Sequence, residues 1–303
     1  MRILILSCAA MLLISKVCPA DEPVQPTEVS VPDLNLRKVI TETLMRRKIP
    51  CDVLTSEILA QIRFLNAPNQ GIKSLQGLEY CADLREIHLP GNEIADLKPL
   101  SDCVKVASLD LSANRLSNIA PLAKLTELRA LNVDNNQIED LAVSKLTNLR
   151  ALYASQNRLS SLNSVAGLTD LHSLYVSDNQ IEDIAALSSL TQLNSLDLRN
   201  NAVKDVTPLA RLRKLRWTFL ANNQIEDLSI FVGMADADAR KEFASCWRLF
   251  LDDNPLAEQA TEQLKSLRKS GVSVSARQSV AEPATDEEGA TKKEAAKASV
   301  SDD

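Results

Sequence analysis

The segment LHSLYVSDNQIEDI, residues 171–184, holds the pattern that decides the fold of this 303-residue chain. Nearly the same letters recur as LRALNVDNNQIEDL at 128–141 and as TFLANNQIEDL at 218–228. The equivalent asparagines are Asn92, Asn114, Asn136, Asn157, Asn179, Asn201, Asn223 and Asn254. They follow one another at intervals of 21 or 22 residues, apart from the last interval of 31. Such a constant period predicts a solenoid, in which each repeat forms one coil and stacks on its neighbours.

Each repeat reads L-x-x-L-x-L-x-x-N-x-I/L-x-x-I/L, and we number its positions from the first leucine. Apolar positions 4 and 6 alternate with polar positions 3, 5 and 7, which predicts a half-buried strand. The later apolar positions 11, 14, 17 and 20 would face the same interior from the return path. The asparagine at position 9 lies inside the coil, so its amide must be paired, most simply with backbone groups of its own and adjacent coils. We therefore expect a structural ladder of asparagines without a catalytic role.

These repeats resemble those of the internalin-type, 22-residue leucine-rich repeat proteins of bacteria over roughly residues 31–275. The resemblance rests on the period, on a helical segment ahead of the first repeat, and on forms such as NEIADLKPL at 92–100 and NRLSNIAPLAKL at 114–125. It implies an α/β leucine-rich repeat solenoid, with a parallel β-sheet on the concave face and short helical or 3-10 turns on the convex face. It also implies a module that binds protein without chemistry of its own and without a cofactor.

The two ends of the chain differ in composition from the repeats. Residues 1–20 combine an apolar run with small residues near the end, which predicts a signal peptide cleaved after Ala20. The chain would then be exported to the periplasm or the medium. A lipid anchor on Cys18 fits less well, because Lys16 stands just before it. Residues 276–303 contain no leucine, isoleucine or aromatic residue, so we expect a disordered tail.

The sequence between these ends predicts four further segments. A linker covers residues 21–30, and a helical N-terminal cap covers 31–61, where apolar residues recur at helical spacing. About nine leucine-rich repeats cover 62–256, with an insertion at 235–243 on the return side. A helical C-terminal cap covers 257–275. Terminal segments of this kind are needed to cover the two raw ends of a solenoid.

The overall charge of the chain is negative. The formal net charge is −6, and it becomes −8 without residues 1–20, which carry two basic residues and no acid. This balance argues against a nucleic-acid partner, which would need a basic face. Beyond residue 20 the sequence holds no apolar segment long enough to span a membrane. We expect a monomer whose partner is a protein.

The outward-facing strand positions 3 and 5 hold six of the ten aromatic residues of the chain. The residues predicted to bind a partner on the concave face are Phe64, His88, Asp110, Asn132, Tyr153, Tyr175, Asp197, Trp217, Phe219 and Phe250. Aromatic residues are enriched in binding hot spots, and we expect the half from Tyr153 to Phe250 to contribute most. Two alternatives stay open. The aromatics could cover neighbouring backbone, as they often do in strands, or they could stack on a cell-envelope polysaccharide.

Catalysis and metal binding are less favoured by the sequence. His88, Asp110 and Ser112 fall within reach of one another, but no motif for an activated serine surrounds Ser112. The two histidines lie in distant repeats, so no metal site is expected. Acidic residues recur at position 13, where Asp and Asn more often begin turns than bind cations.

The sequence leaves the state of two cysteines open. Cys81 and Cys103 both occupy position 20, in neighbouring coils, so their side chains would stack inside the convex wall. In an oxidising compartment a disulfide between them is possible. Two free buried thiols that replace leucine are an equal alternative, because cysteine packs as a small hydrophobic residue.

Overall fold

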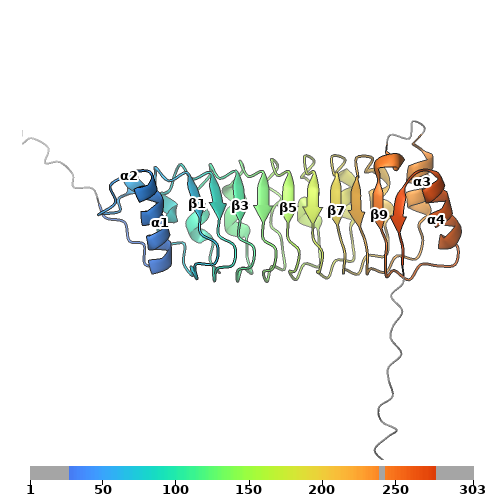
Figure 1. The fold of residues 1–303 in the computed structure, drawn as a ribbon, viewed down its shortest axis with the longest axis horizontal. Helices are drawn as coiled ribbons and strands as arrows, with labels where there is room; N and C mark the ends of the chain where they lie inside the picture. Colours follow the sequence, from blue (N-terminus) through green and yellow to red (C-terminus); the bar gives the residue numbers. More distant parts are fainter. Residues whose placement is uncertain (1–26, 239–242, 278–303) are drawn as a thin grey trace, which may run out of the picture.

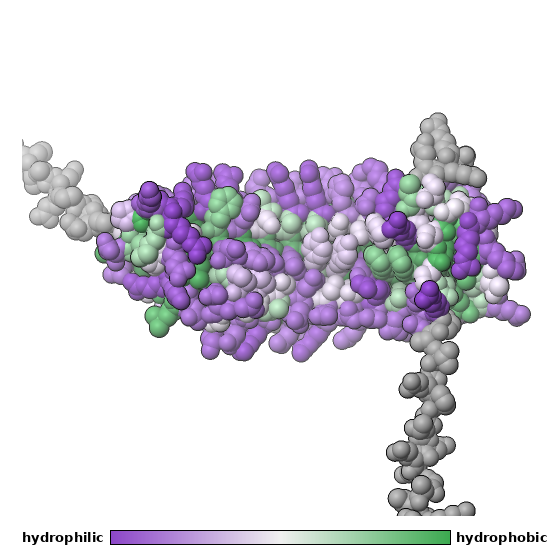
Figure 2. Space-filling model, viewed as in Figure 1, coloured by the Kyte–Doolittle hydropathy of each residue, from purple (hydrophilic) through white to green (hydrophobic). Residues whose placement is uncertain are grey.

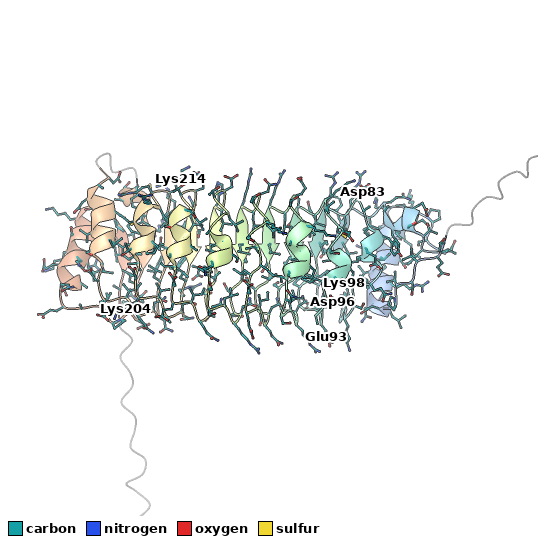
Figure 3. The ribbon with its side chains drawn as sticks, turned by 180° about the vertical axis from the view of Figure 1, so that it is seen from behind. Asp83, Glu93, Asp96, Lys98, Lys204 and Lys214 are labelled. Atoms are coloured by element: carbon teal, nitrogen blue, oxygen red, sulfur yellow. The ribbon has the colours of Figure 1, made fainter. Side chains whose placement is uncertain are left out.

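The computed structural model describes residues 27–238 and 243–277. These residues form an elongated solenoid in which one parallel sheet occupies a whole face, with helices at both ends (Figure 1). Short 3-10 helices line the opposite wall, as the view from behind shows (Figure 3). The predicted solenoid fold is thus confirmed. The predicted signal peptide, most of the predicted linker and tail, and residues 239–242 of the predicted insertion lie outside the described residues.

The sheet is built from very short strands that pair in chain order. The ten strands of the described residues are β1 Phe64–Asn66, β2 Glu86–His88, β3 Ser108–Asp110, β4 Ala130–Asn132, β5 Ala151–Tyr153, β6 Ser173–Tyr175, β7 Ser195–Asp197, β8 Trp217–Phe219, β9 Arg248–Phe250 and β10 Ser273–Ser275. Each pairs in parallel with the next, and equivalent repeat positions are partners, as with Tyr153 and Tyr175. We number each coil by its strand, so coil 4 contains β4.

The return path of most coils contains a short 3-10 helix. These helices are η1 Leu78–Tyr80, η2 Lys98–Leu100, η3 Ala120–Lys124, η4 Asn163–Val165, η5 Ala185–Ser189, η6 Thr207–Arg211 and η7 Ala244–Cys246. An acidic residue at position 13 begins η2, η5 and η6: the Asp96 carboxylate accepts a hydrogen bond from the Lys98 backbone N–H at 2.8 Å, and Asp183 and Asp205 do the same for Ala185 and Thr207, both at 2.8 Å. These contacts are Asx turns, which agrees with the turn interpretation.

Coil 4, which is one residue short, shows how the return path absorbs changes in length. Its return path contains no 3-10 helix, and Ala142 adopts a positive φ of 44° there. The pairing of β4 with β5 nevertheless keeps the same register as every other pair of strands. The sheet is therefore constant while the return side varies.

The interior of the coils is almost entirely apolar. In coil 4, Leu131 from the strand and Ile138 and Leu146 from the return path are at most 1% exposed. Each fully buried side chain of this size contributes about 2 kcal/mol of burial free energy. A single coil has too few such residues to compensate for its loss of chain entropy, so stability comes from stacking.

The ladder asparagines supply the polar contacts inside this apolar core. The Asn136 amide donates to the carbonyl oxygens of Val133 at 3.0 Å, in its own coil, and of Leu111 at 3.1 Å, in the preceding coil. Its side-chain oxygen accepts from the Leu116 backbone N–H at 2.9 Å. The same pattern recurs at each ladder position up to Asn254. Each asparagine therefore joins two coils.

A left-handed residue stands just before each ladder asparagine. Asn135, Asn200 and Asn222 have φ values of 53°, 55° and 55°. Glycine, asparagine and aspartate tolerate this conformation better than other residues, which explains why six of the eight repeats read NN, DN or GN at this point, with Ala113 and Gln156 as the exceptions. Gly91 has a further reason, since a Cβ added there would lie 2.0 Å from the Asn69 side-chain oxygen.

We expect Asn136→Ala to lower the free energy of unfolding by about 3 kcal/mol, because it leaves several buried backbone groups of two coils without partners. Equilibrium urea denaturation measures this loss. Asn148→Ala is the matched control: that side chain is exposed and donates only to the Thr126 carbonyl at 2.8 Å, so it should change stability by less than about 1 kcal/mol. Equal losses for the two variants would contradict a structural role for the ladder.

One carboxylate fastens the N-terminal cap to the first coil. The cap contains α1 Leu34–Arg46 and α2 Ser56–Leu59. One oxygen of Asp33 caps α1 by accepting from the backbone N–H groups of Asn35 and Leu36, both at 3.0 Å. The other accepts from those of Lys73 at 2.7 Å and Ser74 at 3.0 Å. Burial alone would raise the pKa of Asp33, but the four backbone donors outweigh it and hold the pKa below its ordinary value.

Asp33→Ala should lower stability by about 2 kcal/mol at pH 7. Because the folded-state pKa of Asp33 is depressed, its contribution is present above the unfolded value of about 3.9 and is lost as the pH falls through the lower folded value. Urea denaturation at neutral pH and at several acidic pH values should therefore show the parent and the variant converging below about pH 4. A difference that stays constant with pH would contradict the four-donor site.

The C-terminal end is organised around one buried tryptophan. In coil 8, α3 Ser229–Asp236 takes the place of the 3-10 helix. Trp247 is fully buried and contacts Phe243 and Phe231, with ring centroids 4.8 Å and 5.6 Å away. Its indole N–H donates to the Thr218 hydroxyl at 2.9 Å, and Thr218 is also fully buried. This bond explains why threonine stands at a strand position where the other repeats have an aliphatic residue.

The last described element is a strand that the sequence analysis did not foresee. After α4 Ala260–Lys269 the chain turns at Gly271, which has a φ of 97°, and enters β10. Val274 of β10 pairs with Leu249 of β9. The cap therefore extends the sheet by one strand. None of the helices in the described residues is both long and apolar enough to cross a membrane.

Candidate functional site

The concave face is the solvent-facing side of β1–β10. In most strands the central residue is buried and its two neighbours point outward, so positions 3 and 5 form two columns along the face. Figure 2 shows purple, hydrophilic edges above and below a band that contains paler and green atoms. Phe64 is 55% exposed and Trp217 is 38% exposed. The other predicted aromatics are half-buried: Tyr153, Tyr175, Phe219 and Phe250.

The aromatic residues of the second half stack on one another. Tyr153 and Tyr175 have ring centroids 5.1 Å apart, and those of Phe219 and Phe250 are 4.7 Å apart. Trp217 lies 6.2 Å from Phe219 and also carries the Arg248 guanidinium 4.3 Å above its ring. We call Tyr153, Tyr175, Trp217, Phe219 and Phe250 the aromatic half. The stacks fix these rings and leave one side of each group open to solvent.

Asp197 does not lie exposed on this face as the sequence analysis expected. Its side chain is only 2% exposed, because the Arg199 guanidinium covers it with two bonds of 2.9 Å and 2.6 Å. The same guanidinium lies 5.3 Å above the Phe219 ring. Its hydrogen bonds to Asp197 raise the pKa of Arg199. A partner would therefore meet the cation of Arg199 at this point and not the carboxylate of Asp197.

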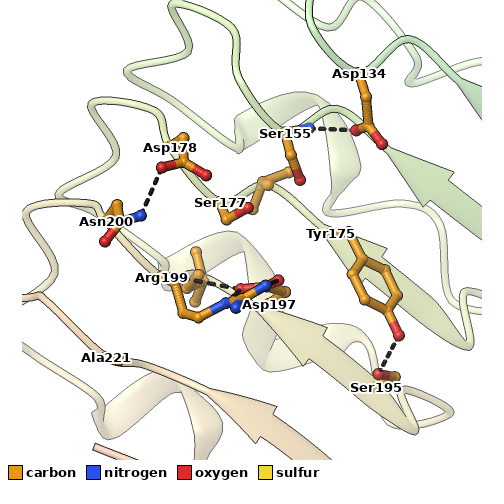
Figure 4. A network of polar contacts seen from close by, with 12 residues as sticks. Asp134, Ser155, Tyr175, Ser177, Asp178, Ser195, Asp197, Arg199, Asn200 and Ala221 are labelled. Carbon is orange, nitrogen blue, oxygen red and sulfur yellow. Dashed lines mark hydrogen bonds and ion pairs between the residues drawn. The ribbon is translucent and has the colours of Figure 1, made fainter. Parts of the chain in front are cut away.

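Arg199 and its neighbours were missed by the sequence reasoning, which considered positions 3 and 5 alone. An arginine two residues after an aspartate in a strand lies on the same face, so the spacing of Asp197 and Arg199 could have predicted their contact. Around the pair, the Tyr175 hydroxyl is hydrogen-bonded to the Ser195 hydroxyl at 2.7 Å (Figure 4). The Asp178 carboxylate accepts from the Asn200 side-chain amide at 2.5 Å.

Asp134 is a partly buried acid at the edge of this group of polar side chains. It accepts from the Ser155 backbone N–H at 2.6 Å (Figure 4). Burial raises the pKa of Asp134 above its ordinary value, and the negative charges of Asp110 and Asp197 add to this, although the bond from Ser155 opposes it. The network holds the polar side chains beside the aromatic half in fixed positions before any partner arrives.

The first half of the face brings His88, Asp110 and Ser112 together in an order that does not suit catalysis. The two oxygens of Asp110 contact the His88 ring nitrogen at 2.9 Å and the Ser112 hydroxyl at 2.8 Å. In a serine-protease triad the histidine stands between the other two and removes the proton from serine. Here the aspartate stands in the middle. His88 and Asp110 border a shallow hollow of about 290 Å³ that Phe64 also lines.

Metal ligands do not gather on this face. Within residues 27–238 and 243–277, no three side chains among His, Cys, Asp and Glu are placed to hold a metal ion together. Asn132, the remaining predicted site residue, uses its side-chain oxygen to accept from the Asp134 backbone N–H at 3.0 Å. It therefore supports the loop after β4.

Cys81 and Cys103 are both buried and free in the structure, so the disulfide that the sequence left open is not formed there. The Cys103 thiol lies 3.3 Å from the Leu78 carbonyl oxygen. Burial raises the pKa of the Cys81 thiol to about 12 and that of Cys103 to about 11. Neither thiol would form a reactive thiolate at neutral pH. Cys246 is exposed, and Cys51 is intermediate.

We expect iodoacetamide at pH 8 to modify Cys246 in the folded protein while Cys81 and Cys103 stay protected until the chain unfolds. Mass spectrometry of peptides from folded and urea-unfolded samples, prepared without reductant, measures this. All of the cysteines after residue 20 should react in urea. Resistance of both Cys81 and Cys103 in urea, lifted by a reductant, would show that they form a disulfide.

The comparisons with known proteins agree with this architecture. Residues 83–246 match the model of the leucine-rich repeat region family. Internalin C2 of Listeria monocytogenes is 32% identical with a TM-score of 0.65, and the match covers 71% of this chain and 96% of that one. A second Listeria monocytogenes internalin, InlF, is 28% identical with a TM-score of 0.50, over 82% and 91% of the two chains. A leucine-rich repeat protein of Leptospira interrogans shares the fold at 20% identity and a TM-score of 0.63, over 73% and 62%. No curated protein matches the chain.

A solenoid that presents one long, open, parallel sheet is an architecture typical of protein-interaction modules. The chain belongs to the leucine-rich repeat family and, within it, to the internalin type.

Proposed function

We propose that this chain is an exported, non-enzymatic recognition module that binds a protein partner through its concave face, mainly through the aromatic half. The observation that carries the proposal is the set of stacked, half-exposed rings of Tyr153, Tyr175, Trp217, Phe219 and Phe250 on four strands of one sheet. Large apolar rings left open to water are unfavourable unless a ligand covers them. Aromatic residues are also the ones that most often dominate binding energy.

The dimensions of the face suit a protein partner. Ten strands at about 4.8 Å each give a face about 43 Å long, and the aromatic half covers about 19 Å of it between β5 and β9. A standard interface buries about 800 Å² on each partner, which a face of this length can supply.

The rigidity of the site also supports the proposal. Stacking fixes the rings, and hydrogen bonds fix Tyr175 and Arg199. Side chains that are already ordered lose little conformational entropy on binding, so more of the contact energy becomes affinity. The open face and the Asp-centred arrangement of His88, Asp110 and Ser112 give no support to a catalytic role.

Export rests on residues 1–20, whose composition is that of a signal peptide. The similarity to internalins adds to this expectation. The exported chain would begin at Asp21, which sequencing of the N-terminus of the protein recovered from periplasm and medium would check.

The proposal is tested by capturing proteins from envelope and culture-supernatant extracts on the immobilised chain and on a face variant. The variant carries Tyr153→Ser, Tyr175→Ser, Trp217→Ser and Phe219→Ser. A protein retained by the parent should be lost from the variant. With that protein purified, titration should give an affinity at least about tenfold weaker for the variant, because several hot-spot rings are removed.

The matched control replaces four apolar side chains that are exposed outside the concave face, through Leu34→Ser, Met45→Ser, Val53→Ser and Val104→Ser. This control should bind like the parent, and thermal melts should show that both variants are folded. Equal binding by the face variant, or no bound protein at all, would contradict the proposal. Retention of an envelope polysaccharide in place of a protein would favour the glycan alternative.

A further inference from the structure

A row of arginines stands where the strands begin. The residue just before the strand is arginine in four of the first five coils, Arg63, Arg85, Arg129 and Arg150, and alanine in coil 3. These positions are stacked by backbone hydrogen bonds: the Arg85 N–H donates to the Arg63 carbonyl at 2.9 Å, and the Arg150 N–H donates to the Arg129 carbonyl at 2.8 Å. We call these four residues the arginine row. It borders the first half of the concave face.

The charges of the row are only partly balanced within the described chain, because the Asp83 carboxylate attracts Arg63 and Arg85 but is itself paired with Lys105. All four side chains are exposed, and none of them forms an ion pair with a carboxylate of residues 27–238 or 243–277. Other basic residues of the solenoid are paired across coils, such as Lys105 with Asp83 at 2.5 Å and Lys124 with Asp102 at 2.8 Å. The row is thus a local excess of cations.

The two edges of the sheet differ in charge. The three residues before each of β1–β8 include seven Lys or Arg and three Asp or Glu. The four residues after each position 9 of the same coils include four Lys or Arg and nine Asp or Glu. Figure 3 shows Asp83 and Lys214 on the first edge and Glu93, Asp96 and Lys204 on the second. In a chain with a net charge of −6, the cations are therefore concentrated on one edge beside the concave face.

The spacing of the row matches one kind of acidic segment better than another. Successive coils are about 4.8 Å apart, so Arg63 and Arg150 are separated by about 19 Å. Four turns of an α-helix advance about 22 Å, whereas four same-side steps of an extended chain advance about 27 Å. Flexible arginine side chains can take up the smaller difference. The acidic residues of a helix with one such residue per turn therefore have nearly the same spacing as the arginines of the row, whereas those on one side of an extended strand do not.

We propose that the arginine row binds an acidic face of an α-helix in the protein partner. The proposal rests on the proposed function, in which the same partner covers the aromatic half. The aromatic half supplies the short-range contacts, and the row attracts and orients the approaching partner by charge complementarity.

Two synthetic peptides of about 20 residues test the proposal without any knowledge of the partner. Both have the same composition of Glu, Ala and Gln; one places Glu at every fourth position, along one side of a helix, and the other distributes Glu around the helix. Fluorescence anisotropy at about 20 mM salt should show that the one-sided peptide binds the chain about fivefold more tightly. The difference should disappear at about 500 mM salt.

The variant with Arg63→Gln, Arg85→Gln, Arg129→Gln and Arg150→Gln should bind the one-sided peptide about tenfold more weakly. Its control carries Lys73→Gln, Arg115→Gln, Arg158→Gln and Lys204→Gln, which remove the same charge from the other edge and should leave binding unchanged. Equal affinity for the two peptides would overturn the helical match. Equal binding by the two variants would overturn the row as the site.

The face variant separates this proposal from the proposed function. Replacement of the four rings by serine should leave peptide binding intact, since the peptide has no apolar contact to make with the aromatic half. Loss of peptide binding in that variant would overturn the assignment to the row. Absence of a captured protein, with one-sided peptide binding intact, would contradict the proposed function while the acid-binding row stands.

Discussion

The buried asparagine amide is the contact on which the rest of the structure depends. Where the backbone leaves each strand and turns toward the return path, its N–H and C=O groups enter an apolar interior without a regular ladder partner. The amide satisfies groups of two coils at once, as Asn136 does for Leu111 and Val133. Since coils 2–9 all make this contact, they stack in one register. The columns of the concave face are aligned because of this bond.

Most of the fold could be predicted from the sequence, because the repeat period determines both which positions are buried and which lie on the concave face. The exceptions are contacts that join distant residues. Thr218 interrupts the aliphatic pattern of its repeat because Trp247, 29 residues later, donates to its hydroxyl. Asp33 reaches Lys73 across 40 residues. The strand β10 has only three residues, too few for alternation to reveal it.

The sequence predicted which strand positions face outward, but it did not predict how exposed each side chain at these positions is. Position in the repeat decides which side chains point outward, and this placed the aromatic half and Phe64. Exposure depends also on what neighbouring side chains do. Arg199 folds over Asp197 and conceals it, and Asp110 takes both His88 and Ser112 as partners. Such choices depend on side-chain rotamers, which repeat periodicity does not encode.

The return path varies in length from coil to coil, but the spacing of the strands on the concave face stays constant. Coil 4 is shortened and coil 8 carries α3, yet the strands pair without a change of register. Length can therefore vary behind the sheet without disturbing what lies on it. The spacing along the sheet between one member of the arginine row and one ring of the aromatic half, such as Arg63 in coil 1 and Trp217 in coil 8, is then fixed by the number of coils between their strands and can change only in whole steps of about 4.8 Å. For a partner that contacts both regions, the gain or loss of one coil between two contact residues would move these residues apart or together by one full strand spacing.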